Sequence, residues 1–140
     1  MGLGLAFATE LSSRNINTIL VGLENEGLEE TCKNLISTFG TDSIFFETDL
    51  TVKENIVSLV ENISSSYSVS ILINNAGIGG TKRFADADVD YLDTIIQLNV
   101  KATSMVTHQF LPNLLKQKKA FVLNVSSIAA FSPIGFKTVY

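Results

Sequence analysis

Short apolar runs alternate with helical apolar stripes along the whole chain. Four runs without polar alternation predict buried β-strands, at residues 18–21, 43–46, 69–73 and 120–125. Apolar positions at helical spacing predict helices at about residues 3–11, 28–39, 56–63 and 89–115. Strands buried on both faces and separated by helices predict an α/β fold with a parallel sheet covered on both sides.

Glycine and polar residues gather just beyond the predicted strands, at Gly22, Asp49, Asn74 and Ser127. In open parallel sheets, ligands bind beyond the carboxyl ends of the strands. These positions therefore predict the ligand-binding edge of the sheet. In the long last helix, Pro112 is expected to distort or end the helical run.

Composition narrows the classes of function. The 140 residues are 46% hydrophobic and 17% charged, which predicts a single folded domain over residues 1–140. A net charge of -4 argues against a nucleic-acid partner. Neither a membrane span of ~18 apolar residues nor a signal-peptide pattern is found, so the expected compartment is the cytoplasm. Cys32 and His108 lack companions at ligand spacing, so no metal site is expected.

Two glycine-containing motifs are candidates for binding a cofactor. Gly2-Leu3-Gly4 opens the first predicted helix, where backbone N–H groups could approach a pyrophosphate. The alternative is a flexible terminus. The run Asn74-Asn75-Ala76-Gly77 follows a buried strand and could let a flat ligand lie against the backbone, or could be an ordinary turn.

A serine and a tyrosine are candidates for catalysis. Ser127 ends the last predicted strand, and Tyr140 follows thirteen residues later. A hydroxyl at this strand end can donate to a substrate carbonyl oxygen or can cap a turn. A tyrosine acts as a general acid or base near neutral pH only if positive charge lowers its pKa from about 10; a packing role is the alternative.

Taken in order, these motifs resemble those of the short-chain dehydrogenase/reductase family. The order is Gly-x-Gly, a strand-end aspartate, Asn-Asn-Ala-Gly, a helix asparagine in Asn99-Val100, Asn-Val-Ser-Ser, and a tyrosine thirteen residues after the second serine. The resemblance extends from Gly2 to Tyr140. It implies a doubly wound, Rossmann-like parallel sheet that is incomplete here, because the family's first strand and C-terminal part lie outside residues 1–140.

The resemblance implies an NAD(P)-dependent oxidoreductase that transfers a hydride between a nicotinamide and an alcohol or carbonyl substrate, such as a 3-oxoacyl compound or another ketone. Asn99 would hold a water in a proton relay, Ser127 would polarise the carbonyl, and Tyr140 would be the acid or base. The implied cofactor-binding residues are Gly2, Gly4, Gly22, Leu23, Asp49, Leu50, Asn75, Ala76, Gly77 and Tyr140.

The cofactor is expected to be NADP or NAD. Members that prefer NAD usually carry an acidic residue where Gly22 stands, and members that prefer NADP often carry arginine where Leu23 stands. Glu24 would disfavour a 2′-phosphate and Arg14 would attract one. Because Gly22 removes the usual repulsive carboxylate, we expect a slight preference for NADP.

The family's tyrosine is followed four residues later by a lysine, a position beyond residue 140. We therefore expect the longer parent protein to be active and the 140 residues alone to be inactive. The alternatives are a non-catalytic dinucleotide-binding or regulatory fragment and, less well matched, a sugar-nucleotide epimerase. The resemblance also implies a homodimer or homotetramer through residues 98–110, and residues 131–136 are expected to form a loop over the substrate.

Overall fold

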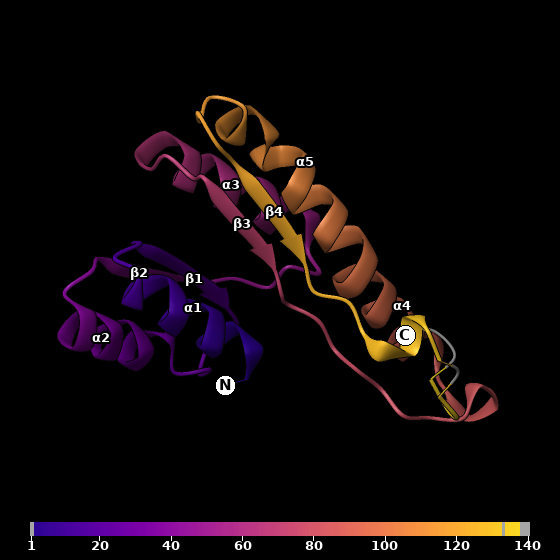
Figure 1. The fold of residues 1–140 in the computed structure, drawn as a ribbon. Coiled ribbons are helices and arrows are strands. Elements are labelled where there is room, and N and C mark those ends of the chain that lie inside the picture. The colour runs from indigo at the N-terminus through magenta and orange to yellow at the C-terminus, as the bar shows by residue number, and fades with distance from the viewer. Residues whose placement is uncertain (1, 133, 138–140) are drawn as a thin grey trace. The chain divides into compact units, whose positions relative to one another are not determined.

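The computed structural model describes residues 2–132 and 134–137, which form two compact units. The first covers residues 1–49 and the second residues 50–140. Each contains a two-stranded parallel sheet with its own helices (Figure 1). The α/β class expected from the alternating pattern is confirmed.

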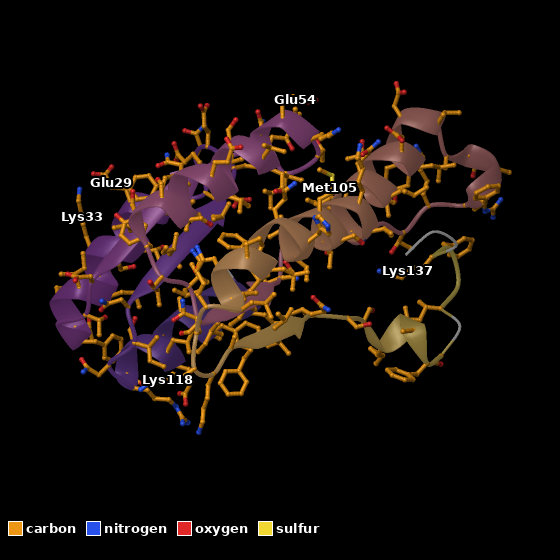
Figure 2. The ribbon with its side chains drawn as sticks, turned by 90° about the horizontal axis from the view of Figure 1, so that it is seen from above. Glu29, Lys33, Glu54, Met105, Lys118 and Lys137 are labelled. Carbon is orange, nitrogen blue, oxygen red and sulfur yellow. The ribbon has the colours of Figure 1, made fainter. Side chains whose placement is uncertain are left out.

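The first unit is a β-α-β element preceded by one helix. In chain order it consists of α1 (Leu3–Ser13), β1 (Thr18–Gly22), α2 (Leu28–Phe39) and β2 (Ser43–Glu47). The strands pair in parallel, with Thr18 opposite Ser43 and Gly22 opposite Glu47. The helices α1 and α2 pack against each other, and both contact β1 (Figure 1). On the outer side of α2, Glu29 and Lys33 form an ion pair of 2.7 Å (Figure 2).

A polar contact lies inside the first unit, between the strands and α2. The buried hydroxyls of Thr18 and Ser43 are 2.8 Å apart, and the Ser43 hydroxyl donates to the sulfur of Cys32 at 3.3 Å. Cys32 is buried with its thiol free, as expected for a packed side chain. Thr41 is also buried, but its hydroxyl has no hydrogen-bond partner.

In the second unit, one helix packs on the strand pair and a second packs on that helix. It contains α3 (Lys53–Ser66), β3 (Ile71–Asn74), α4 (Val89–Ile96), α5 (Thr103–Leu114) and β4 (Phe121–Asn124). The strands pair in parallel from Ile71 opposite Phe121 to Asn74 opposite Asn124. Helix α5 packs on α3 and contacts both strands (Figure 1). The stripe predicted for α3 is buried, and it consists of Ile56, Leu59, Val60 and Ile63.

The strand predicted at residues 69–73 begins two residues later, at Ile71. The reason is Asn113, which is 8% exposed on α5. Its side-chain oxygen accepts the Val69 N–H at 2.8 Å, and its amide donates to the Tyr67 carbonyl at 2.9 Å. At Tyr67 and Val69 the backbone is thus bound to a helix, and the first bond to β4 is at Ser70, whose carbonyl accepts the Phe121 N–H at 2.9 Å.

Two other predictions need correction. The strand predicted at residues 120–125 is shorter, and its four residues, Phe121–Asn124, are exposed although β3 and α5 both contact it. The helix at residues 89–115 is interrupted by a π-helical segment, Gln97–Ala102. Pro112 lies inside α5, which ends two residues later, and the Leu115 N–H still donates to the Leu111 carbonyl at 2.9 Å.

Replacing Thr18 by valine tests the buried hydroxyl pair. The change keeps the shape of the side chain but removes one partner of the Ser43 hydroxyl, so the free energy of unfolding should fall by about 1 kcal/mol. Thr41→Val is the matched control, since the hydroxyl that it removes has no partner and its loss should not destabilise. Urea unfolding of the protein at its natural length, followed by circular dichroism, measures both. Equal losses for the two variants would contradict the role of the pair.

Candidate functional site

In the first unit, the candidate phosphate-binding residues form the start of α1. Gly2 is the N-cap, Gly4 lies in the first turn, and the Ala6 N–H donates to the Gly2 carbonyl at 3.2 Å. The first turn carries no acidic side chain. The N–H groups at a helix start favour an anion, and here no carboxylate of the same turn competes with it.

The end of β1 carries a feature that the sequence did not indicate. The Leu23 N–H donates to Glu26 Oε2 at 3.3 Å, so the Glu26 carboxylate folds back toward the strand. A Cβ added to Gly22 would lie 2.5 Å from the same oxygen. A side chain at residue 22 would require the carboxylate to move from this position. The pattern Gly-x-x-x-Glu-Gly carries no recognised signal for this contact, so sequence reasoning considered Glu24 instead.

Two other charged residues of this unit were considered at the sequence level. Arg14 lies at the far end of α1, roughly 18 Å from its first turn at 1.5 Å per residue. Its guanidinium pairs with the Glu10 carboxylate. The Arg14 charge, which was expected to attract a 2′-phosphate, is therefore at the opposite end of α1 from the candidate phosphate-binding turn. Asp49 lies exposed two residues beyond β2, and Leu50 begins the second unit.

In the second unit, Asn74 joins the ends of the two strands. Its amide donates to the side-chain oxygen of Asn124 at 2.7 Å and to the Thr107 hydroxyl of α5 at 2.8 Å. Asn75 follows half-buried, and Ala76 and Gly77 are exposed beyond the strand end. The turn therefore offers a backbone surface at the carboxyl edge of the sheet.

Asn99 fixes the other side of this turn. It lies in the π-helical segment, and its side chain makes two hydrogen bonds to one residue, Ile78. Its oxygen accepts the Ile78 N–H at 3.0 Å, and its amide donates to the Ile78 carbonyl at 2.9 Å. A Cβ on Gly77 would lie 3.1 Å from the Asn99 oxygen. The structure thus brings together Gly77 and Asn99, which are 22 positions apart.

Beyond this turn, the chain is held against the start of α4. Asp88 caps the helix by accepting the Tyr91 N–H at 2.7 Å, and it pairs with the Lys82 ammonium at 3.1 Å. These contacts, the Tyr91 N–H first, hold the pKa of Asp88 below its usual range. The Lys82 ammonium also lies 5.1 Å from the centre of the Tyr91 ring. Gly80 fits here because a Cβ would overlap the Tyr91 hydroxyl.

The same loop also contacts the chain beyond β4. The Lys82 N–H donates to the Phe136 carbonyl at 3.0 Å, and the Arg83 guanidinium lies 5.8 Å from the centre of the Phe136 ring. Phe136 adopts a left-handed backbone (φ 65°), which is unusual for a bulky residue. Four residues before Tyr140, the backbone is therefore tied to the loop that follows β3.

Ser127 lies three residues after the end of β4, at the same sheet edge as Asn74. It caps a short 3₁₀ helix, Ile128–Ala130, by accepting the Ala129 N–H at 3.2 Å. The cap uses the hydroxyl oxygen as an acceptor, so the O–H hydrogen is still available to donate. Tyr140, the other predicted catalytic residue, lies outside the described residues.

Within residues 2–132 and 134–137, no three His, Cys, Asp or Glu side chains come together where they could hold a metal ion. No helix in that part of the chain is long and apolar enough to cross a membrane.

Asn99→Ala removes both hydrogen bonds to Ile78 and should lower the free energy of unfolding by about 2 kcal/mol, since it leaves a half-buried amide group without its partners. The Ile78 amide should also exchange its hydrogen faster. Asn34→Ala, at an exposed position of α2, is the control and should change stability by less than about 0.5 kcal/mol. An Ile78 amide that exchanges equally slowly in Asn99→Ala would contradict this role.

Gly80→Ala should lower stability by about 1–3 kcal/mol, because the new methyl group displaces the Tyr91 ring and the contacts around Lys82. Gly135→Ala is the matched control, since a Cβ there meets no atom within 4 Å. Thermal unfolding measures both variants. Adding Tyr91→Ala to Gly80→Ala should cost less than the sum of the two single changes. Simple additivity would show that the two residues do not interact.

Comparison with known proteins relates this geometry to a family. The family model described as short chain dehydrogenase matches residues 1–140. An uncharacterized oxidoreductase of Staphylococcus epidermidis is 31% identical over 140 residues, which are 99% of this chain and 59% of that protein. The inactive hydroxysteroid dehydrogenase-like protein 1 of Homo sapiens is 29% identical over 134 residues, covering 94% of this chain and 41% of that protein. The chain thus spans about half the length of these relatives.

Solved structures share the fold. L-sorbose reductase from Gluconobacter frateurii, complexed with NADPH and L-sorbose, has a TM-score of 0.93 at 25% identity, over 99% of this chain and 53% of that one. The bulky-bulky ketone specific alcohol dehydrogenase from Comamonas testosteroni has a TM-score of 0.91 at 22% identity, over 99% of this chain and 56% of that one. These likenesses confirm the Rossmann-like α/β fold with an incomplete sheet. Since the family model covers every residue from 1 to 140, this chain belongs to the short-chain dehydrogenase family.

Proposed function

We propose that these residues form part of an NAD(P)-dependent oxidoreductase that interconverts an alcohol and a carbonyl compound. The observation that carries the proposal is the sheet edge of the second unit. There the turn Asn74–Gly77 is fixed by Asn99, and Ser127 keeps a hydroxyl hydrogen available while its oxygen caps a helix. Carbonyl reduction needs a surface on which the flat nicotinamide ring can lie, and a hydroxyl donor beside that ring. The small residues of the turn could supply the first, and Ser127 the second.

The roles of this chain's residues follow from these contacts. Ser127 donates to the substrate oxygen and stabilises the negative charge that develops on it. Tyr140 gives or takes the proton of that oxygen, a role that requires a positive charge close enough to lower the pKa of its phenol. The Asn99 side chain is committed to Ile78, so a water of the proton relay would be held by its backbone rather than by its amide. A bound dinucleotide supplies the hydride chemistry.

The start of α1 fits the phosphate part of a dinucleotide of the kind that the family uses, NADP or NAD. Its first turn offers N–H groups without an acidic competitor, and neither Gly2 nor Gly4 adds a side chain beside them. L-sorbose reductase and a short-chain dehydrogenase from Sphingobium yanoikuyae were both solved with NADPH. These relatives support the slight preference for NADP.

The substrate is proposed to be a small molecule with a carbonyl or alcohol group on an apolar body, such as a 3-oxoacyl compound or another ketone. Support comes from exposed apolar side chains on the segments that flank Ser127 and the loop after β3. They are Phe84, Ile128, Phe131, Ile134 and Phe136. The most exposed of these five side chains is Phe131, at 92%. The expected substrate loop at residues 131–136 stays a prediction.

A second candidate is a protein that keeps the dinucleotide fold without turnover. The human relative that is named inactive favours it. The residue four positions beyond Tyr140 in the reading frame distinguishes the two functions. A lysine there supplies the charge that lowers the tyrosine pKa and supports the enzyme; a residue without positive charge supports the inactive protein.

We also propose that the parent protein is a homodimer or homotetramer and is cytoplasmic. The support for assembly is the set of large apolar side chains left exposed on the interrupted helix from Ile96 onward, which are Ile96, Val100, Leu111 and Leu115. Three of these four lie outside the stretch 98–110 or at its border, so the proposed interface extends along both α4 and α5.

Ser127→Ala and Tyr140→Phe should each lower kcat/KM by at least about 100-fold in the protein at its natural length, because one removes the oxyanion donor and the other the proton donor. Binding of NADH and NADPH should be unchanged in Ser127→Ala. The assay follows nicotinamide absorbance with a panel of aliphatic, aromatic and 3-oxoacyl ketones. Ser126→Ala, at the exposed neighbour, is the control and should retain activity. Full turnover by Ser127→Ala would overturn the proposed mechanism.

A further inference from the structure

Glu26 occupies the end of β1 with its carboxylate. Its Oε2 accepts the Leu23 N–H at 3.3 Å and would lie 2.5 Å from a Cβ at Gly22. The three atoms nearest to that Cβ position belong to Glu26 and Leu28, and two of them are the carboxylate oxygen and carbon of Glu26. The carboxylate therefore lies where a side chain of residue 22 would begin.

The turn between β1 and α2 produces this placement. The Glu26 N–H donates to the Leu23 carbonyl at 3.4 Å, which closes the chain on itself over four residues. Asn25 takes the left-handed conformation that the turn requires (φ 66°), which asparagine tolerates better than most residues. Gly27 then begins α2 as its N-cap. The backbone thus directs the side chain of Glu26, an exposed residue, back toward the strand.

This position matters for a dinucleotide because of its distance from the phosphate turn. Gly22 lies 20 residues after Gly2. In Rossmann-like folds an acidic residue about 20 positions after the glycine loop accepts hydrogen bonds from the ribose hydroxyls of NAD. In this chain residue 22 has no side chain, and the carboxylate arrives from four positions later.

A 2′-phosphate at this place would meet unfavourable conditions. It would approach a carboxylate of the same sign, and the Leu23 N–H that could receive it is already donated to Glu26. Arg14, the cation considered above, lies at the far end of α1 and is paired with Glu10. A ribose with a free 2′-hydroxyl, in contrast, could donate to the carboxylate. Placing like charge against the unwanted ligand is a general means of discrimination.

We propose that Glu26 is a specificity-determining residue that weakens the binding of NADP relative to NAD. The inference rests on the proposed dinucleotide-binding function. Glu26 acts against the slight preference for NADP that Gly22 alone indicates, and it limits the size of that preference. The residue that sets cofactor choice is thus in the turn after the strand, not at its last position.

Glu26→Gln tests the inference, because it keeps the size of the side chain and removes its charge. Titration of the protein at its natural length with NADPH and with NADH, followed by nicotinamide fluorescence without substrate, gives both Kd values. The ratio of the Kd for NADPH to the Kd for NADH should fall about tenfold, and Glu26→Lys should lower it further. Glu24→Gln removes the same charge from the same turn and should change the ratio less than about threefold.

Two outcomes contradict different statements. Suppose that both dinucleotides bind, but the ratio of their Kd values stays the same in Glu26→Gln and Glu26→Lys, or falls equally in Glu24→Gln. The role of Glu26 is then overturned, and the proposed function stands. If neither dinucleotide binds to the unchanged protein, the proposed function itself is overturned, and the inference with it.

Discussion

The two hydrogen bonds between the Asn99 side chain and Ile78 hold the functional edge of the second unit in place. They satisfy both backbone groups of Ile78, in the loop that follows β3. The Gly77 backbone lies so close to the Asn99 oxygen that no side chain fits comfortably between them. Without this contact the turn after β3 would be free to move, and a ligand surface made of backbone would lose its shape.

A chain of contacts continues from that turn. Gly80 lies under Tyr91, Lys82 reaches Asp88, and the backbone of Lys82 holds Phe136. Each contact alone is modest, and the exposed ion pair is the weakest of them. Together they join the segments after β3 and after β4, which carry the candidate substrate-binding and catalytic residues. Order in one segment therefore depends on order in the other.

The elements were predictable from the sequence because apolar periodicity reports burial directly. The stripe of α3 and the cores of β1, β2 and β3 appeared where the pattern placed them. The exposure of β4 was not predictable, since an apolar run does not show how many neighbours will cover it. The late start of β3 depends on one buried amide, Asn113, from a helix 44 residues away from Val69.

For the candidate site, the motif residues were identified by resemblance, but their contacts were not. The sequence marked Asn99 as functional without showing that both ends of its amide are used by Ile78. It gave no sign of Glu26 at Gly22, because that contact depends on a left-handed asparagine within a tight turn. The apolar periodicity of a sequence predicts where helices and strands form. It does not predict contacts such as that of Glu26, because they depend on the backbone conformation of a loop.

The π-helical segment has a consequence for helical phase. A π turn holds more residues than an α turn, so it is equivalent to one residue inserted into a continuous α-helix. Each residue advances an α-helix by about 100°. The wider turn advances less per residue, which offsets the rotation that the extra residue would add, so the buried side of α5, with Val106 and Phe110, still faces α3. Deleting one residue between Gln97 and Ala102 would therefore give a continuous α-helix with the same buried side, and the main change would be in the position of Asn99.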